Sequence, residues 1–234
     1  MRTILMNAAI FLALAAVIVG CGTTPVDDGT GTTPKDVYNV YYDTDGLANN
    51  SVNDLAVDYF HSGLWVATQK GISFYAFKDS TWTTYGTESG LPNLKVTSAA
   101  INLGTVWAGT MSGPASLDGV AWKELANTGV LPNTYITALT SMPEPDYSLW
   151  FGTRGGVVKR SATGEWKNWN ITSGLVSNDV TSIARDRDGN IWVGTQYGIS
   201  VYDGTKWTSY TTILPSTAVR AVFTDSYGAV WVGT

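Results

Sequence analysis

The chain has 234 residues, enough for one sizeable all-β domain or two small ones. Charged residues make up only 14% of it, well below the roughly 25% of an average soluble protein, whereas glycine, tryptophan and tyrosine are plentiful, which favours many turns and short strands. The formal charge is −5 and no run of Lys and Arg occurs, which argues against a nucleic-acid partner because phosphate recognition needs a basic face.

The N-terminal segment has the pattern of an export signal. Arg2 gives a positive start, the apolar run ILMNAAIFLALAAVIVG follows, and Cys21, the only cysteine, comes directly after it. We therefore predict a signal peptide over residues 1–20. An uncleaved transmembrane helix is the alternative, since the apolar run is about long enough to span a bilayer.

The end of this segment, IVGC at residues 18–21, resembles the lipobox of bacterial lipoproteins. The resemblance implies that Cys21 carries lipid, that the leader is cut before it, and that the protein is anchored in the cell envelope. Gly22, in place of an Asp, points to the outer membrane. Residues 21–36 are rich in Thr, Gly, Pro and Asp, so we predict that they form a flexible linker between the lipid and the domain.

A single strand is predicted next, at residues 37–42. Tyr38 precedes Gly46 by eight residues, just as Trp166 precedes Gly174 later in the chain. The segment therefore matches the outermost strand of a later repeat without that repeat's other strands. We predict that it closes a ring by joining the sheet begun at the C-terminus, since closure removes exposed sheet edges.

The rest of the chain repeats about every 42 residues. The phrases LWVAT, VWAGT, LWFGT, IWVGT and VWVGT each carry a tryptophan, at spacings of 42, 43, 42 and 39 residues, and a glycine follows the first four tryptophans by six residues. A period near 42 with several short β runs is typical of a β-propeller blade. We expect the repeated tryptophans to pack between blades rather than bind a ligand: Trp65, Trp107, Trp150, Trp192 and Trp231.

The predicted fold is an all-β β-propeller, over residues 37–234, with four-stranded blades of about 42 residues. A solenoid of helix pairs would need a 3.6-residue periodicity, which is absent. Because the last two predicted strands would leave an open sheet edge, we expect the ring to be truncated at residue 234. Four full blades are expected at about 51–86, 95–126, 135–170 and 179–211, and a partial blade at 216–234.

The segment VTSIARDRDGNIWVGTQYGISVYDGTKWTSY, which starts at Val180, resembles the two-component regulator propeller repeat. The first and third repeats match it more loosely, and the second diverges most. In that family the propellers form the periplasmic sensor part of hybrid sensor kinases, often linked to polysaccharide-derived signals. No kinase sequence follows the repeats here. The resemblance therefore implies a propeller on a lipoprotein that binds a ligand or a partner.

Propellers usually bind ligands on one face, over the central channel, with the loops between strands b and c and between strands d and a, counted from the centre outwards. The b–c turns have the form Thr-x-x-Gly, and the two variable residues project from rigid strand ends. The alternative is an ordinary solvent-exposed turn. The candidate ligand-binding residues are Gln69, Lys70, Arg154, Gln196 and Tyr197 in these turns, and Asn53, Tyr135 and Arg220 near the starts of strands a.

We identify no catalytic residues, no metal ligands and no cofactor motif. His61 is the only histidine, and the DRDGN turn at residues 186–190 lacks the distal Glu of a calcium loop. The preferred hypothesis is a non-catalytic envelope lipoprotein that binds a carbohydrate-like ligand or a protein partner. Two alternatives stay open: a lyase or glycoside-acting enzyme with carboxylates at the channel mouth, and a purely structural interaction module.

Overall fold

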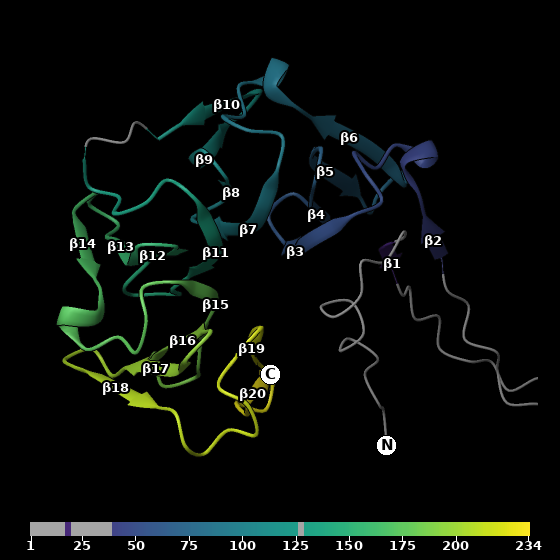
Figure 1. The fold of residues 1–234 in the computed structure, drawn as a ribbon. Coiled ribbons are helices and arrows are strands. Elements are labelled where there is room, and N and C mark those ends of the chain that lie inside the picture. The colour runs from purple at the N-terminus through teal and green to yellow at the C-terminus, as the bar shows by residue number, and fades with distance from the viewer. Residues whose placement is uncertain (1–16, 20–38, 126–128) are drawn as a thin grey trace, which may run out of the picture.

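The structure is a computed structural model that describes residues 17–19, 39–125 and 129–234. Four four-stranded antiparallel sheets and one two-stranded sheet follow one another along the chain, around a common centre (Figure 1). This arrangement confirms the predicted propeller fold class. Most of the predicted signal peptide, and the predicted linker with Cys21, lie outside the described residues.

Each sheet is ordered a, b, c, d along the chain, with strand a facing the centre and strand d on the outside (Figure 1). The first sheet is β3 (Val52–Asp58), β4 (Gly63–Thr68), β5 (Gly71–Ala76) and β6 (Thr81–Tyr85), and the second is β7 (Val96–Asn102), β8 (Thr105–Thr110), β9 (Gly113–Asp118) and β10 (Ala121–Glu124). The third is β11 (Ile136–Ser141), β12 (Leu149–Thr153), β13 (Gly156–Arg160) and β14 (Trp166–Trp169), and the fourth is β15 (Val180–Arg185), β16 (Ile191–Thr195), β17 (Gly198–Tyr202) and β18 (Trp207–Tyr210). The last sheet has two strands, β19 (Ala221–Thr224) and β20 (Val230–Gly233).

The turns that lead into three of the strands a share one construction. Each contains a single 3-10 turn that ends at a glycine with a positive φ, and the leucine after that glycine is buried. Burial of this leucine fixes the turn to the core, so it positions the start of the next strand a. The 3-10 turns are η2 (Asp43–Asp45), η3 (Thr87–Ser89) and η4 (Ile171–Ser173), and the leucines are Leu47, Leu91 and Leu175. In the described part of the chain, no helix is long and apolar enough to cross a membrane.

Neighbouring sheets meet through small residues on strand b. A Cβ atom added at Gly152 would lie 2.6 Å from Cγ1 of Val180 in the next sheet, and one at Gly194 would lie 2.7 Å from Cγ1 of Val219. Glycine at these positions therefore lets the next strand a approach closely. The Thr181 hydroxyl adds a hydrogen bond across the same junction, since it donates to the Val219 carbonyl at 2.7 Å.

The repeated tryptophans of strand b fill the space between sheets. Trp65 is 3% exposed and meets Trp122 of the next sheet edge-on, with ring centroids 5.9 Å apart. Trp150 stacks on Trp169 of its own sheet, with ring centroids 5.1 Å apart and an interplanar angle of 10°, and its ring lies 5.7 Å from that of Tyr202 in the next sheet. Trp231, on the two-stranded sheet, differs because 56% of it is exposed.

The sheets do not form a closed ring in the described residues. The segment predicted as the closing strand forms β2 (Asn39–Tyr41), which pairs with β1 (Val17–Val19) instead of with the β19–β20 sheet. β2 lies beside the first sheet, with the Tyr41 hydroxyl 2.7 Å from the Tyr75 hydroxyl and the Tyr41 ring 5.5 Å from that of Trp82.

The position of β2 matches that of a strand d in the other sheets. Trp169 of β14 contacts Tyr202 and Trp207 of the following sheet, as Tyr41 contacts the corresponding residues of the first sheet. β2 thus lies relative to the first sheet as β14 lies relative to the fourth. Its pairing with the C-terminal sheet stays a prediction.

Candidate ligand-binding site at the channel mouth

The b–c turns are fixed by a buried threonine at the end of strand b. The Thr153 hydroxyl donates to the Gly156 carbonyl at 2.8 Å and accepts from the Gly155 N–H at 2.9 Å. Because both bonds lie within the turn, the residues between Thr153 and Gly156 are held in one conformation. The same pair of hydrogen bonds is made by Thr68, Thr110 and Thr195.

The glycine that ends each of these turns fits where no other residue would. Gly156 has a φ of +131°, and a Cβ atom there would lie 2.2 Å from the carbonyl oxygen of Trp169. The glycine therefore allows strand c to pair closely with strand d directly after the turn. The threonine and the glycine together explain why the Thr-x-x-Gly pattern recurs while the two residues between them vary.

The b–c turns of the first, third and fourth sheets line a cavity of about 380 Å³ at one end of the central channel. Five of the eight predicted candidate residues line it: Asn53, Gln69, Tyr135, Arg154 and Gln196. Lys95 and Asp179, which precede strands a of the second and fourth sheets, line it as well. We call this cavity the mouth.

The other three candidates lie close to the mouth without lining it. Lys70 and Tyr197 are exposed on the same turns as Gln69 and Gln196, and Tyr197 is 64% exposed. Arg220 lines the deeper part of the channel. The sequence pattern therefore predicted turns that lie at this cavity, but it could not tell which side chain of each variable pair lines it.

Several side chains of the mouth are held by other protein groups. The Arg154 guanidinium lies over the Tyr135 ring, 4.3 Å from its centroid, a cation–π contact. The Gln69 side-chain NH₂ donates to Asn53 Oδ1 at 2.8 Å, and Asn53 Nδ2 donates to the Val96 carbonyl at 2.6 Å. Asn53 thus joins the first and second sheets and orients Gln69, so we assign it a supporting role.

The mouth continues into a channel cavity of about 520 Å³ between the strands a. The residues shared by the two cavities are the second residues of β3, β7, β11 and β15, and each stands at a β-bulge where the register with strand b shifts. A bulge redirects a side chain, here toward the axis of the channel. The four bulged residues are Asn53, Thr97, Thr137 and Thr181.

The channel below the bulges is lined largely by small and hydroxyl-bearing residues, among them Ser98, Ala138 and Ser182. Within the described residues, the buried side-chain hydroxyl oxygens of Ser98 and Thr137 have no hydrogen-bond partner. A polar ligand or water in the channel could satisfy both. No sequence motif indicated these two hydroxyls.

Three aspartates also line the channel. Asp186 and Asp225 each accept a hydrogen bond, at 2.8 Å, from the indole of their own sheet's repeated tryptophan. Burial raises the pKa of Asp54 to about 6, against the opposing effect of its hydrogen bonds from the backbone N–H groups of Ala99 and Leu55. The equivalent positions in the next sheets hold Ser98 and Ala138, so the repeat gave no signal for Asp54.

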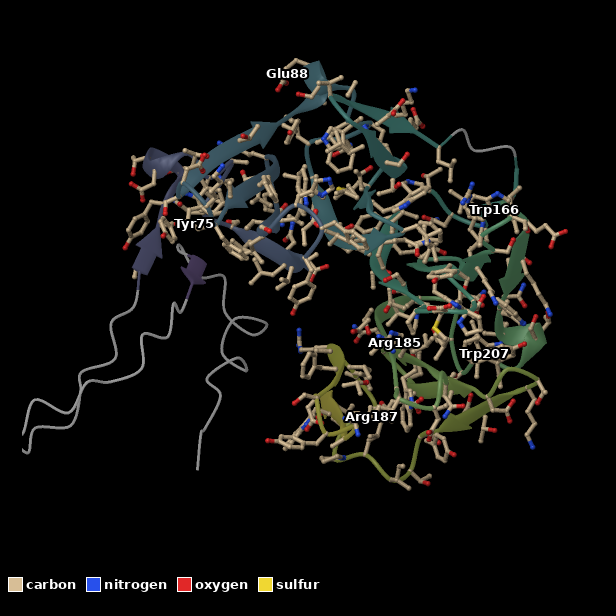
Figure 2. All side chains as sticks on the ribbon, turned by 180° about the vertical axis from the view of Figure 1, so that it is seen from behind. Tyr75, Glu88, Trp166, Arg185, Arg187 and Trp207 are labelled. Atoms are coloured by element: carbon tan, nitrogen blue, oxygen red, sulfur yellow. The ribbon has the colours of Figure 1, made fainter. Side chains whose placement is uncertain are left out.

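The groups considered for catalysis or metal binding lie elsewhere or apart. His61 is exposed in the turn between β3 and β4, at the far end of β3 from the mouth, and its Nδ1 lies 2.8 Å from Asp58 Oδ2. In residues 17–19, 39–125 and 129–234, no three His, Cys, Asp or Glu side chains come together where they could hold a metal ion. Arg185 and Arg187, by contrast, line the channel cavity near the C-terminal hairpin (Figure 2), where the Arg187 guanidinium donates to the Ser226 carbonyl at 2.6 Å.

The fold and the mouth define a β-propeller with a polar cavity at one end of its channel. Residues 174–197 and 213–234 match the model of the two component regulator propeller family. These two segments therefore match the two-component regulator propeller repeat, the resemblance that the sequence pattern predicted. No curated protein sequence matches the chain.

Solved structures with the same fold include the extracellular domains of two proteins from B. thetaiotaomicron described as hybrid two component systems, BT4673 and BT3049. The BT4673 domain has a TM-score of 0.66 and 20% sequence identity, and the match covers 87% of this chain and 27% of that chain. The BT3049 domain has a TM-score of 0.62 and 19% sequence identity, and the match covers 85% of this chain and 35% of that chain. This chain thus spans about a quarter to a third of their length. A third structure is a catalytically inactive histidine-to-alanine variant of virginiamycin B lyase from Staphylococcus aureus with Quinupristin. It has a TM-score of 0.64 and 15% sequence identity, and the match covers 85% of this chain and 68% of that chain.

Proposed function

We propose that the protein is an exported lipoprotein, with a signal peptide over residues 1–20, lipid on Cys21 and a flexible linker over residues 21–36. The lipobox-like IVGC sequence supports this proposal. The extracellular location of the two similar sensor domains is consistent with export. Gly22, in place of an Asp after the lipidated cysteine, supports anchoring in the outer membrane.

The proposed activity is non-catalytic binding, at the mouth, of a carbohydrate-like ligand or a protein partner. The observation that carries it is the convergence of three rigid b–c turns on one cavity, which they line with the polar side chains Gln69, Arg154 and Gln196. A cavity of about 380 Å³ lies within the size range of small-molecule sites. Variable residues on an invariant frame are what a binding site needs in order to acquire specificity.

An enzymatic function has less support from the channel. Two of its aspartates are bonded to tryptophan indoles, and the third, Asp54, is bonded to two backbone N–H groups. The similar virginiamycin B lyase loses catalysis in a histidine-to-alanine variant, whereas His61 of this chain lies away from the mouth. Binding is therefore the function that the geometry supports best.

The test is a titration of the full chain with a panel of neutral and acidic oligosaccharides by isothermal titration calorimetry. We expect at least one to bind, and expect Arg154→Ala and Gln196→Ala each to weaken it by about tenfold. Lys206→Ala, on the outer turn before β18, is the matched control and should bind as the unchanged protein does. Binding that both mouth variants leave intact would refute the assignment of the mouth.

A further inference from the structure

The charge at the mouth is opposite to that of the whole chain. The formal charge of the protein is −5, yet Lys95 and Arg154 line the mouth against a single carboxylate, Asp179. Lys70 is exposed on the turn that carries Gln69, at the rim of the mouth. Two cations and one carboxylate line the mouth and a third cation lies at its rim, so the local charge there is positive and favours an anion. The channel below the mouth is lined by three arginines and three aspartates, so the excess of positive charge belongs to the mouth.

The cations that line the mouth are not neutralised by the protein. The three ion pairs of the described residues are His61–Asp58, Lys123–Asp118 and Lys159–Asp146, and none involves the mouth. A charged group that the protein leaves without a counter-ion, at the rim of a half-enclosed cavity, is available to a ligand of opposite charge.

Arg154 is also held in place before any ligand arrives. Its guanidinium rests on the Tyr135 ring, and the Tyr135 N–H is fixed by a 2.8 Å hydrogen bond to Asn133 Oδ1. The turn that carries Arg154 is closed by the two Thr153 hydrogen bonds and lies tightly against Pro132, since a Cβ atom on Gly155 would approach the Pro132 carbonyl to 2.9 Å. A planar guanidinium fixed in this way suits a carboxylate, which it can bind with two parallel hydrogen bonds.

The remaining groups of the mouth suit a polyhydroxylated ligand. Gln69 and Gln196 bring amides that can both donate and accept, and the bulged Thr137 and Thr181 bring hydroxyls. Tyr197, 64% exposed on the same turn as Gln196, offers a flat ring at the rim. Val180 is the only aliphatic residue among those that line the mouth, and it is buried, which leaves little for the apolar side chains of a peptide.

We propose that the mouth recognises an acidic saccharide, with the carboxylate of a uronic acid bound by Arg154 and Lys95 and the sugar hydroxyls bound by the amides and hydroxyls around them. The inference rests on the proposed binding function and adds the chemical class of the ligand. It predicts that a saccharide without its uronic acid carboxylate loses most of its affinity for the mouth, and that added salt weakens the binding of the acidic saccharide.

The probes are oligosaccharides of galacturonate, mannuronate and glucuronate, each beside its carboxyl-reduced, neutral counterpart, titrated into the full chain at low salt. At least one acid should bind tenfold or more tightly than its neutral counterpart, and this preference should shrink in about 0.5 M salt. The substitutions Arg154→Gln and Lys95→Gln should each abolish most of the preference for the acid, while Lys206→Gln should leave this preference unchanged. Tyr135→Phe should retain it and Tyr135→Leu weaken it, because the ring is what supports the guanidinium.

The outcomes separate the two proposals. Equal binding of acids and their neutral counterparts would overturn the acidic class and leave carbohydrate binding standing. No binding of any saccharide, acidic or neutral, would overturn both the acidic class and the carbohydrate ligand. An oligoglutamate peptide that binds as tightly as the best acid, with the same dependence on Arg154, would overturn the saccharide assignment in favour of a protein partner.

Discussion

At the scale of single residues, an aspartate that accepts a hydrogen bond from the indole of the repeated tryptophan recurs in three of the sheets. Asp58, Asp186 and Asp225 accept from the indole N–H groups at 2.8–2.9 Å. Burial alone would raise the pKa of Asp186, but hydrogen bonds from Trp192 and Asn190 outweigh it and hold the pKa below the usual 3.8. Asp186 also accepts from the Asp188 N–H, so it fixes the whole a–b turn.

The aspartate–indole contacts make acid destabilising. Because the folded-state pKa of Asp186 lies below its unfolded value, the contact stabilises fully above about pH 4 and is lost as pH falls through the folded pKa. Asp186→Ala should lower the free energy of unfolding by about 1–3 kcal/mol at pH 7, since it leaves buried donors unpaired. In urea unfolding followed by tryptophan fluorescence, the difference from the unchanged protein should shrink below about pH 4.

Asp179→Ala is the control for that measurement, since its carboxylate is exposed and makes no side-chain hydrogen bond in the described structure. It should change the free energy of unfolding by less than about 0.5 kcal/mol. An Asp186→Ala deficit that persists undiminished at about pH 2 would show that the ionised carboxylate is not what stabilises the turn.

At the scale of elements, the b–c turn joins stability to function. Its threonine and glycine are the same in all four turns, and both are buried. The threonine hydroxyl donates to the glycine carbonyl, and the two residues between them differ from turn to turn. A ligand site on such turns changes specificity without changing the fold.

Gly156→Ala tests the turn. Alanine would add both an unfavourable φ and a Cβ atom 2.2 Å from the Trp169 carbonyl oxygen, so we expect a loss of at least about 3 kcal/mol in the free energy of unfolding. Gly119→Ala is the matched comparison, because Gly119 also has a positive φ but has nothing within 4 Å of an added Cβ. It should lose only about 1–2 kcal/mol, the cost of the backbone alone. Equal losses in urea unfolding would contradict the close approach.

The strands could be predicted well because the same pattern of β runs and turns occurs in four successive repeats of the sequence. In the fourth repeat, the DRDGN segment at residues 186–190 was interpreted as a turn, and β15 ends at Arg185 while β16 begins at Ile191. The bulges at Asn53, Thr97, Thr137 and Thr181 could not be predicted, because a bulge is a register shift between two strands and leaves no mark in the residue type. Asp54 was missed for a related reason, since its burial depends on sheets that are distant in sequence.

At the scale of the whole molecule, the sheets form an arc whose inner strands line one channel and whose b–c turns share one end of it (Figure 1). The outer strands carry Trp166, which packs on Phe151 of its own sheet, and Trp207, which packs on Trp169 of the preceding sheet (Figure 2). The second, third and fourth sheets each meet the next through a strand-b glycine, as Gly152 meets Val180, so the turns are held at fixed places around the axis. The mouth is thus formed by residues from several sheets together, and no single repeat contains it.

The most direct test of the mouth is hydrogen–deuterium exchange of the full chain with and without its best-binding oligosaccharide. Ligand should slow exchange in the b–c turns at residues 68–71, 153–156 and 195–198 and leave the a–b turns at 59–62 and 186–190 unchanged, because the two sets of turns lie at opposite ends of the strands a and b. Protection confined to the a–b turns, or to none of these segments, would contradict the account.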